Sequence, residues 1–263
     1  MTELRLIEVT KIFMPLFFLV LMVSSCKKNN GEGELPPENP EGKLELLNEI
    51  DLNISEPSGL AFGPDGKTLL IVSDNTNKVY ETDLQGGVIR ELAYVGSDLE
   101  GVGFDAATQT VAVAEERKRE VVFLTYNDGT EIERQHIETG GNTVNKGLEG
   151  LSYNGNNRAW YLVNEDVPGE MIVWNKTFGN ITVKPLDFAS DYSGIFVDEE
   201  NALLYFVSDE SQMLFKCNYN ADVLKKYPLP YTKFEGVAVD SRQQVVYLVN
   251  DKSGKLFIYK FIN

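Results

Sequence analysis

Leu148-Glu149-Gly150-Leu151-Ser152-Tyr153 is one of five similar stretches that decide the fold of this 263-residue chain. In each copy a Ser or Glu precedes a glycine, and small or apolar residues follow it. The spacings between the five glycines are 42, 49, 44 and 42 residues, and the glycines are Gly59, Gly101, Gly150, Gly194 and Gly236. A repeat of about 40 to 50 residues that holds several short strands is typical of the blades of a β-propeller.

Each repeat can be divided into four short strands. In the fourth copy, strands are predicted over 195–197, 203–207, 213–217 and 223–229, with turns rich in Asp, Glu, Asn and Ser between them. Apolar and aromatic residues alternate or run together inside these segments, which is the strand-and-hairpin pattern. No segment of helical length has a period of 3.6 residues. The sequence therefore predicts an all-β protein, a five-bladed β-propeller over residues 43–263.

The last repeat ends too early to contain its fourth strand. Only three residues follow Lys260, whereas residues 43–52 form a strand-like segment that precedes the first repeat. We expect this N-terminal strand to complete the last blade, so that the ring is closed by both ends of the domain and no blade edge is left open.

The N-terminus has the pattern of a bacterial lipoprotein signal. The apolar run 12–23 follows Arg5 and Lys11, and it ends in Val23-Ser24-Ser25-Cys26. Such a run is short for a membrane span and suits a signal peptide over residues 1–25. Its end resembles a lipobox, which implies cleavage before Cys26 and lipid on that cysteine. The alternative is an uncleaved membrane anchor with an unmodified Cys26.

Residues 26–42 follow as a lipidated cysteine and a flexible tether, because Gly, Pro and acidic residues at that density cannot build a core. Lipid tethers a protein to a membrane without making it span the bilayer. We therefore expect the protein at the bacterial cell envelope, on the periplasmic face or the cell surface. The second cysteine, Cys217, lies in an apolar strand and is predicted to be buried and unpaired.

The chain carries a formal net charge of −16. This excludes nucleic acid, and an anionic lipid surface, as partners bound through a basic face, because both require clustered Lys and Arg. Cations or basic partners suit the charge better. The alternative is that the acidity only keeps the protein soluble.

The order of the repeated motifs resembles the SdiA-regulated family of bacterial envelope proteins. The matching residues include the five motifs together with 114–117 (AEER) and 207–211 (VSDES). The resemblance covers residues 43–263 and implies a five-bladed propeller that is distantly similar to NHL-type propellers and contains a calcium site. It implies no settled biochemical activity.

The repeat also brings carboxylates together. The first strand of each blade lines the central channel and the second returns antiparallel to it, so the residue before each glycine should lie beside the residue fifteen after that glycine. The predicted pairs are Ser58 with Asp74, Glu100 with Glu116, Glu149 with Glu165, Ser193 with Asp209, and Glu235 with Asp251. Up to eight carboxylates would surround one mouth of the channel, and they would repel one another unless cations or protons intervene.

Calcium takes six to eight oxygen ligands in flexible geometry, which suits such a ring. Glu100, Glu149 and Glu235 are the first candidate metal ligands, and Glu116 and Glu165 are the second. The alternative is a structural role, in which the glutamates accept hydrogen bonds from backbone amides of the neighbouring blade. The repeated glycines are predicted to mark close backbone approach around a narrow channel.

Two classes of function remain. His136 is the only histidine, so a zinc centre built from several histidines is excluded. It lies in the predicted outer strand of the second blade, away from the channel, and no catalytic residue is assigned. The favoured class is a monomeric, noncatalytic, calcium-containing lipoprotein that binds a peptide, glycan or small molecule of the envelope. The alternative is a calcium-dependent esterase or lactonase whose axial metal polarises an ester carbonyl.

Overall fold

The computed structural model describes residues 41–138, 147–165 and 168–262. The chain divides into two units, residues 1–37 and 38–263, and all the described residues belong to the second. The expected signal peptide and Cys26 lie outside the described residues. Among the residues that are described, no helix is both long and apolar enough to cross a membrane.

The described residues form five antiparallel sheets of four strands each. Blade 1 contains β2 (Pro57–Phe62), β3 (Thr68–Ser73), β4 (Lys78–Asp83) and β5 (Val88–Val95), with the short 3-10 helix η1 (Pro64–Gly66) between the first two. Blade 2 contains β6 (Leu99–Asp105), β7 (Thr110–Glu115), β8 (Glu120–Thr125) and β9 (Glu131–His136). Blade 3 contains β10 (Leu148–Asn154), β11 (Ala159–Asn164), β12 (Glu170–Asn175) and β13 (Asn180–Pro185). Blade 4 contains β14 (Gly194–Asp198), β15 (Leu203–Ser208), β16 (Met213–Asn218) and β17 (Val223–Pro228).

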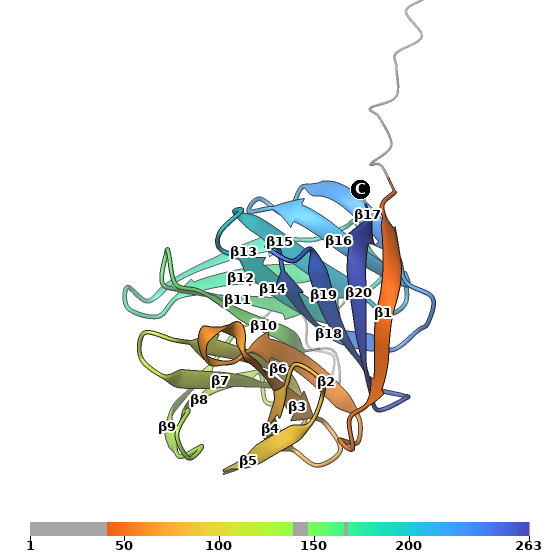
Figure 1. The fold of residues 1–263 in the computed structure, drawn as a ribbon. Helices are drawn as coiled ribbons and strands as arrows, with labels where there is room; N and C mark the ends of the chain where they lie inside the picture. The colour runs from red at the N-terminus through yellow and green to blue at the C-terminus, as the bar shows by residue number, and fades with distance from the viewer. Residues whose placement is uncertain (1–40, 139–146, 166–167, 263) are drawn as a thin grey trace, which may run out of the picture. The chain divides into compact units, whose positions relative to one another are not determined.

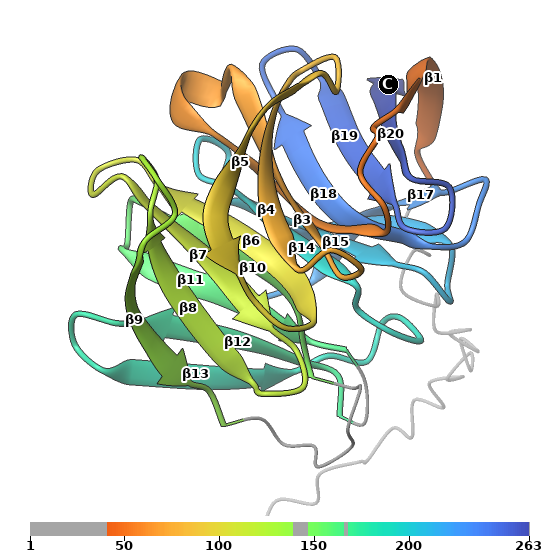
Figure 2. The same ribbon diagram turned by 90° about the horizontal axis from the view of Figure 1, so that it is seen from below.

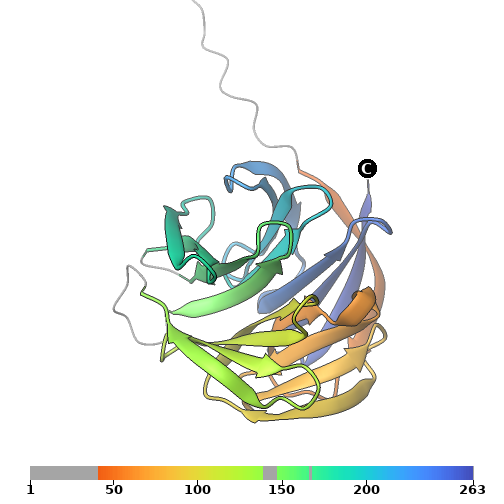
Figure 3. The same cartoon turned by 90° about the vertical axis from the view of Figure 1, so that its left-hand side faces the viewer.

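Blade 5 consists of β18 (Phe234–Asp240), β19 (Val245–Asn250), β20 (Lys255–Ile262) and β1 (Lys43–Asp51). The first strands β2, β6, β10, β14 and β18 surround the axis, and the fourth strands lie on the outside (Figures 1 and 2). Figure 3 shows the blades following one another around the ring. The predicted five-bladed propeller is confirmed.

The ring is closed by strands from the two ends of the domain, as predicted. β1 pairs antiparallel with β20, from Lys43 opposite Ile262 to Asp51 opposite Lys255, and Figure 1 shows the two strands side by side. Just before β1 the chain contacts β17 instead, because Glu41 forms an isolated bridge with Lys226 and Gly42 N donates to Lys226 O at 2.7 Å. The last two residues of the expected tether therefore lie against β17.

Within the described part of the chain the apolar core consists of five clusters, and each fills the space between two neighbouring blades. Val72 and Val102 belong to the cluster between blades 1 and 2, for example, and Leu52 and Tyr247 to the cluster between blades 5 and 1. Cys217 is fully buried between blades 3 and 4 and is a free thiol, as predicted. Since each blade buries its faces against both neighbours, the inner strands have little freedom to move.

The five repeated glycines allow neighbouring inner strands to touch. A Cβ atom at Gly59 would lie 2.6 Å from Glu100 O, and one at Gly150 would lie 2.7 Å from Ile195 N. Gly101, Gly194 and Gly236 approach the next blade's backbone in the same way, so the contacts run around the whole ring. The predicted close approach is confirmed, and these glycines have a packing role.

Gly59→Ala should destabilise the propeller by about 2 kcal/mol, since the obstructing atoms are backbone of β6 and the buried Val72 side chain, and overpacking costs about 1–3 kcal/mol. We expect the melting temperature to fall by about 4–8 °C in a thermal melt. Gly155→Ala is the matched control, because its Cβ would meet only the flexible Glu199 carboxylate, at 3.4 Å. Equal melting temperatures for the two variants would contradict the packing role.

Candidate metal centre

An acidic cavity of about 260 Å³ lies at one end of the central channel. Its wall contains ten carboxylates together with one serine and one lysine. These residues are Asp74, Glu100, Glu116, Glu149, Glu165, Asp191, Ser193, Asp209, Glu210, Lys233, Glu235 and Asp251. All eight carboxylates of the predicted pairs are among them. The strand register read from the repeat therefore places these side chains around one cavity.

The inner strands aim the motif residues into this cavity by means of β-bulges. Pairing of β6 with β7 shifts register between Leu99 and Gly101, and pairing of β10 with β11 shifts between Leu148 and Gly150. Glu100 and Glu149 are the extra residues in these bulges, which redirect a side chain out of the regular ladder. Blades 1 and 5 carry register shifts at the corresponding place.

The other half of the wall comes from the residues directly after the second strands. Asp74 follows β3, Glu116 follows β7, and Glu165 follows β11, while Asp209 and Asp251 occupy the same place in blades 4 and 5. A backbone hydrogen bond fixes this position, since Glu116 N donates to Asp98 O at 2.9 Å. Asp74, Glu165 and Asp251 make the same bond in their own blades.

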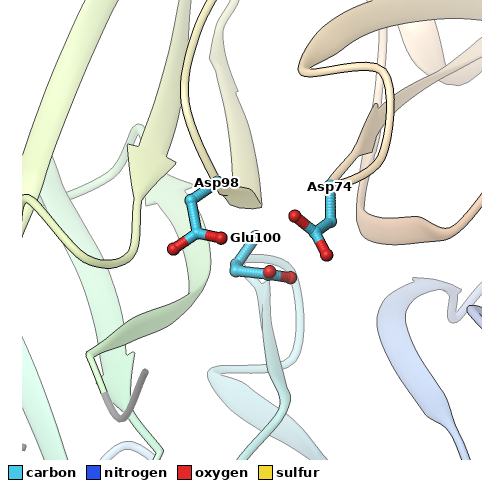
Figure 4. Close-up of side chains that lie close together, drawn as sticks. All are labelled: Asp74, Asp98 and Glu100. Atoms are coloured by element: carbon cyan, nitrogen blue, oxygen red, sulfur yellow. The ribbon is translucent and has the colours of Figure 1, made fainter. Parts of the chain in front are cut away.

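Two triads of carboxylates form within the described residues. In the first, one carboxylate oxygen each from Asp74, Asp98 and Glu100 lie within 4.8 Å of one another, and Figure 4 shows these three groups facing a common space. Glu116, Glu149 and Glu165 form the second triad by the same criterion. Each triad takes residues from two neighbouring blades. The five candidate ligands therefore do not form one group: Glu100 belongs to the first triad and Glu235 to neither.

Glu235 is paired with a lysine that sequence reasoning missed. Lys233 Nζ lies 3.2 Å from Asp209 Oδ2 and 3.5 Å from Glu235 Oε1. Burial lowers the pKa of Lys233, but Glu235 and Asp209 outweigh it and raise the pKa overall. The blade-5 wall of the cavity thus has a built-in positive charge. In the first triad, Asp98 Oδ2 is likewise paired with Arg117, whose Nε lies 3.0 Å away.

A further position of the repeat lies two residues before the Ser or Glu that precedes each glycine. Asp98, Asp191 and Lys233 occupy this position in blades 2, 4 and 5. The five copies have Glu56, Asp98, Gly147, Asp191 and Lys233 at this position. Every copy therefore has a charged residue or a glycine at this position, and this pattern could have marked the position in the sequence. Glu56, Asp98 and Lys233 adopt φ of 45°, 58° and 65°. Such left-handed conformations are uncommon outside glycine.

Burial and like charge hold four glutamates of the cavity toward their protonated form. Burial, then Glu235 and Asp74, raises the pKa of Glu100 well above its usual value. Burial, then Glu100 and Glu116, does the same for Glu149. Burial, followed by Asp98, raises the pKa of Glu116 to about 7, and burial, followed by Asp251, raises that of Glu235 to about 8. The cavity therefore favours a proton or a bound cation.

The structural role weighed from the sequence fits some of these residues and not others. Glu116 Oε1 accepts Gly147 N at 3.2 Å, which joins blade 2 to blade 3. Asp209 accepts the backbone N–H of Lys233 and so joins blade 4 to blade 5. Glu149 has no such donor among the described residues, and its strongest electrostatic neighbours are all carboxylates. Glu149 is thus the clearest candidate for a metal ligand, because it does not join two blades through a backbone hydrogen bond.

Stability of the metal-free protein should fall as the pH rises from about 5 to 8. Glu116 and Glu235 have folded-state pKa values of about 7 and 8 against a usual 4.5, so the folded state holds more protons than the unfolded state in this window. That stabilisation is complete below the usual pKa and is lost as the pH rises through the folded-state values. Thermal melts in chelator at constant ionic strength measure it.

Glu116→Gln should make this pH dependence shallower, because a glutamine cannot lose a proton in the cavity. His136→Gln is the control, since it removes the chain's only histidine, which lies exposed on β9 at the outer edge of blade 2, as predicted from the sequence. A metal-free protein that becomes more stable from pH 5 to 8 would contradict these pKa directions.

The fold and cavity together define a five-bladed propeller with an acidic axial site. Residues 41–261 match the model of the SdiA-regulated family. The chain belongs to this family, which confirms the resemblance seen in its motifs.

Solved structures of similar shape are also β-propellers. The chain resembles glutaminyl cyclase from Myxococcus xanthus with a TM-score of 0.67 and 12% identity, over 85% of this chain and 98% of that one. Virginiamycin B lyase from Staphylococcus aureus is similar with a TM-score of 0.51 and 15% identity, over 79% of this chain and 67% of that one. At these identities the likeness shows the fold alone.

Proposed function

We propose that the acidic cavity binds calcium and that the protein is a noncatalytic binding module, held at the bacterial envelope by lipid on Cys26. The observation that carries the proposal is the triad of Glu116, Glu149 and Glu165, which gathers three carboxylate oxygens within 4.8 Å. Like charges packed this closely in a partly buried cavity are costly unless a cation neutralises them.

The donor set suits calcium. Among the lining residues that the structure describes, every ionisable group other than Lys233 is a carboxylate, and none is His or Cys. Hard oxygen donors select calcium or magnesium over softer transition metals. Because calcium accepts six to eight oxygens in flexible geometry, it suits a ring of independently placed side chains better than magnesium, which demands a near-ideal octahedron. When bound, the ion would supply positive charge at the mouth of the channel.

The binding experiment titrates calcium, and separately magnesium, into chelator-treated protein in a calorimeter. We expect saturable calcium binding and weaker magnesium binding. Absence of heat or of retained metal at millimolar calcium would contradict the proposal. Glu138→Gln is a control for Glu149→Gln, because it removes the same charge from a side chain that is 93% exposed.

A panel of lactones and aryl esters separates the binding module from a calcium-dependent hydrolase. The binding module predicts no hydrolysis beyond that of a Glu149→Gln variant. Calcium-dependent hydrolysis that Glu149→Gln abolishes would replace it with the esterase or lactonase, in which the metal polarises the ester carbonyl.

Lipidation is tested by mass spectrometry of the protein from a bacterial membrane fraction. We expect the mature protein to begin at Cys26 and to carry the mass of its acyl chains, and Cys26→Ser to remain unprocessed. The reason is the apolar run that ends in Val23-Ser24-Ser25-Cys26. An intact Met1 on the membrane-bound protein would contradict the anchor.

A further inference from the structure

A second and larger cavity, of about 690 Å³, lies at the opposite end of the channel from the acidic cavity. We call it the bowl; its volume falls in the range of small-molecule sites. The inner strand β6 runs from Glu100 in the acidic cavity to Gly103 and Phe104 in the bowl. Between the two ends the channel narrows to a space of about 10 Å³, lined by the motif glycines and by apolar residues such as Val102 and Leu151. The two cavities therefore do not share a ligand.

Four partly exposed aromatic side chains from four different inner strands line the bowl. They are Phe62, Phe104, Tyr153 and Phe196. Two of these rings pack against buried or half-buried aromatic residues of their own blades. The Tyr153 and Trp160 ring centroids are 4.5 Å apart, and those of Phe104 and Tyr126 are 5.2 Å apart. The aromatic surface is thus rigid before any ligand arrives, which lowers the cost of binding.

Phe196 departs from the repeat in a way that enlarges this surface. It stands two residues after the motif glycine, where the other blades have small residues, namely Ala61, Gly103, Ser152 and Ala238. The Phe196 and Phe62 rings meet edge to face, with centroids 6.0 Å apart and planes at 80°. Blade 4 therefore places a large ring at the axial position and leaves it partly exposed to the cavity.

The rim of the bowl is acidic. Among the residues that the structure describes, its lining includes five carboxylates and a single basic side chain; the carboxylates are Asp65, Asp198, Glu199, Glu200 and Asp240. The basic residue, Arg242, is already paired with Glu200, with Nε 2.9 Å from Oε2. Glu199 Oε1 accepts Gly155 N at 2.6 Å, which fixes the carboxylate, while no described residue donates to its Oε2. Glu199 is thus placed to meet a positive group.

We infer that the bowl binds a small organic cation, a quaternary ammonium or protonated amine that carries apolar or aromatic groups. Cations are attracted to the faces of aromatic rings, and several rings together recognise alkylammonium groups. The acidic rim adds attraction for the same charge and disfavours anions. This inference rests on the proposed function because it gives the binding module a class of ligand. The bowl, however, lies at the opposite end of the channel from the proposed calcium site.

Benzyltrimethylammonium is the probe, with benzyl alcohol and phenylacetate as neutral and anionic compounds of the same aromatic body. Binding is measured by calorimetry or ligand-observed NMR at physiological salt. We expect the cation to bind and the other two compounds to bind at least about tenfold more weakly, which corresponds to about 1.4 kcal/mol. Equal binding of all three, or no binding of the cation, would overturn the assignment.

Two substitutions locate the site. Phe196→Leu keeps an apolar side chain but removes the ring face, and we expect about tenfold weaker binding of the probe, within the range of a cation–π contact. Glu199→Gln should also weaken it. Phe178→Leu and Glu138→Gln are the matched controls, since both side chains are exposed and lie outside the bowl. Unchanged affinity in both test variants would overturn the assignment.

Repeating the titration in chelator and with Glu149→Gln separates this inference from the calcium proposal. We expect probe affinity to stay unchanged, because the narrow part of the channel, with its space of about 10 Å³, separates the two cavities. Loss of binding under these conditions would place the probe at the acidic mouth and overturn the assignment to the bowl. A protein that binds the probe in the bowl but no calcium would refute only the metal site.

Discussion

Saturating calcium should raise the melting temperature of the chelator-treated protein by about 5–11 °C. A ligand that binds only the folded state at 100 times its dissociation constant stabilises that state by about 2.7 kcal/mol, and each kcal/mol shifts the melting temperature of a domain of this size by about 2–4 °C. The ion would relieve the repulsion among Glu116, Glu149 and Glu165, whose oxygens lie within 4.8 Å. Scanning calorimetry over a calcium series measures the effect.

Glu149→Gln makes this test specific, because it should act in opposite directions with and without metal. Without calcium the variant should melt higher than the wild type, since it removes a carboxylate whose strongest electrostatic neighbours are other carboxylates. With calcium it should lose most of the stabilisation, since it removes a ligand. Glu138→Gln should change neither melting temperature. If neither calcium nor chelator changes the melting temperature of the wild type, these carboxylates have only the structural role of accepting backbone hydrogen bonds from the neighbouring blade.

Deletion of β1 should lower the melting temperature by about 8–16 °C. β1 makes eight paired positions with β20, and loss of the hydrogen bonds at roughly 0.5 kcal/mol each costs about 4 kcal/mol. Its side chains are mostly exposed, so pairing and ring closure account for the effect more than apolar burial does. The deletion also leaves β20 as an unpaired edge, which promotes aggregation.

Two controls separate loss of the strand from loss of chain length. Deletion of residues 27–40 should leave the melting temperature within about 1 °C of the full chain, because neither β1 nor its pairing with β20 is touched. Replacing residues 43–51 with a Gly/Ser segment of equal length should reproduce the β1 deletion. Equal stability of all these variants would mean that β1 does not close the ring.

The five glycine motifs were sufficient to predict the fold, because each glycine is required by a backbone contact that recurs once per blade. The same repeat fixes the strand register, and the register predicted which eight carboxylates surround the mouth. The closing strand could be predicted as well, since residues 43–52 form a strand-like segment that precedes the first of the five repeats.

The grouping of those carboxylates could be predicted only in part: Glu149 and Glu165 lie together as paired from the sequence, but the third member of their triad was not foreseen. The pairs read from the sequence lie within single blades, whereas Glu116 of blade 2 joins Glu149 and Glu165 of blade 3. Which neighbours meet across a blade boundary depends on the β-bulges and on how the ring closes, and neither has a sequence signature in one blade. Asp98 and Lys233 were missed because the sequence argument considered only the residue before each glycine and the residue fifteen after it, whereas these two stand three residues before the glycine.

A crystal structure of the protein grown with calcium tests the metal centre most directly. We expect a peak in anomalous difference density inside the acidic cavity, within about 2.3–2.6 Å of carboxylate oxygens that include Glu149. The Glu149→Gln protein crystallised under the same conditions should lack the peak. A cavity that contains only water in the wild type at millimolar calcium, with Glu149 turned toward a backbone amide, would contradict the assignment of this site as a calcium centre.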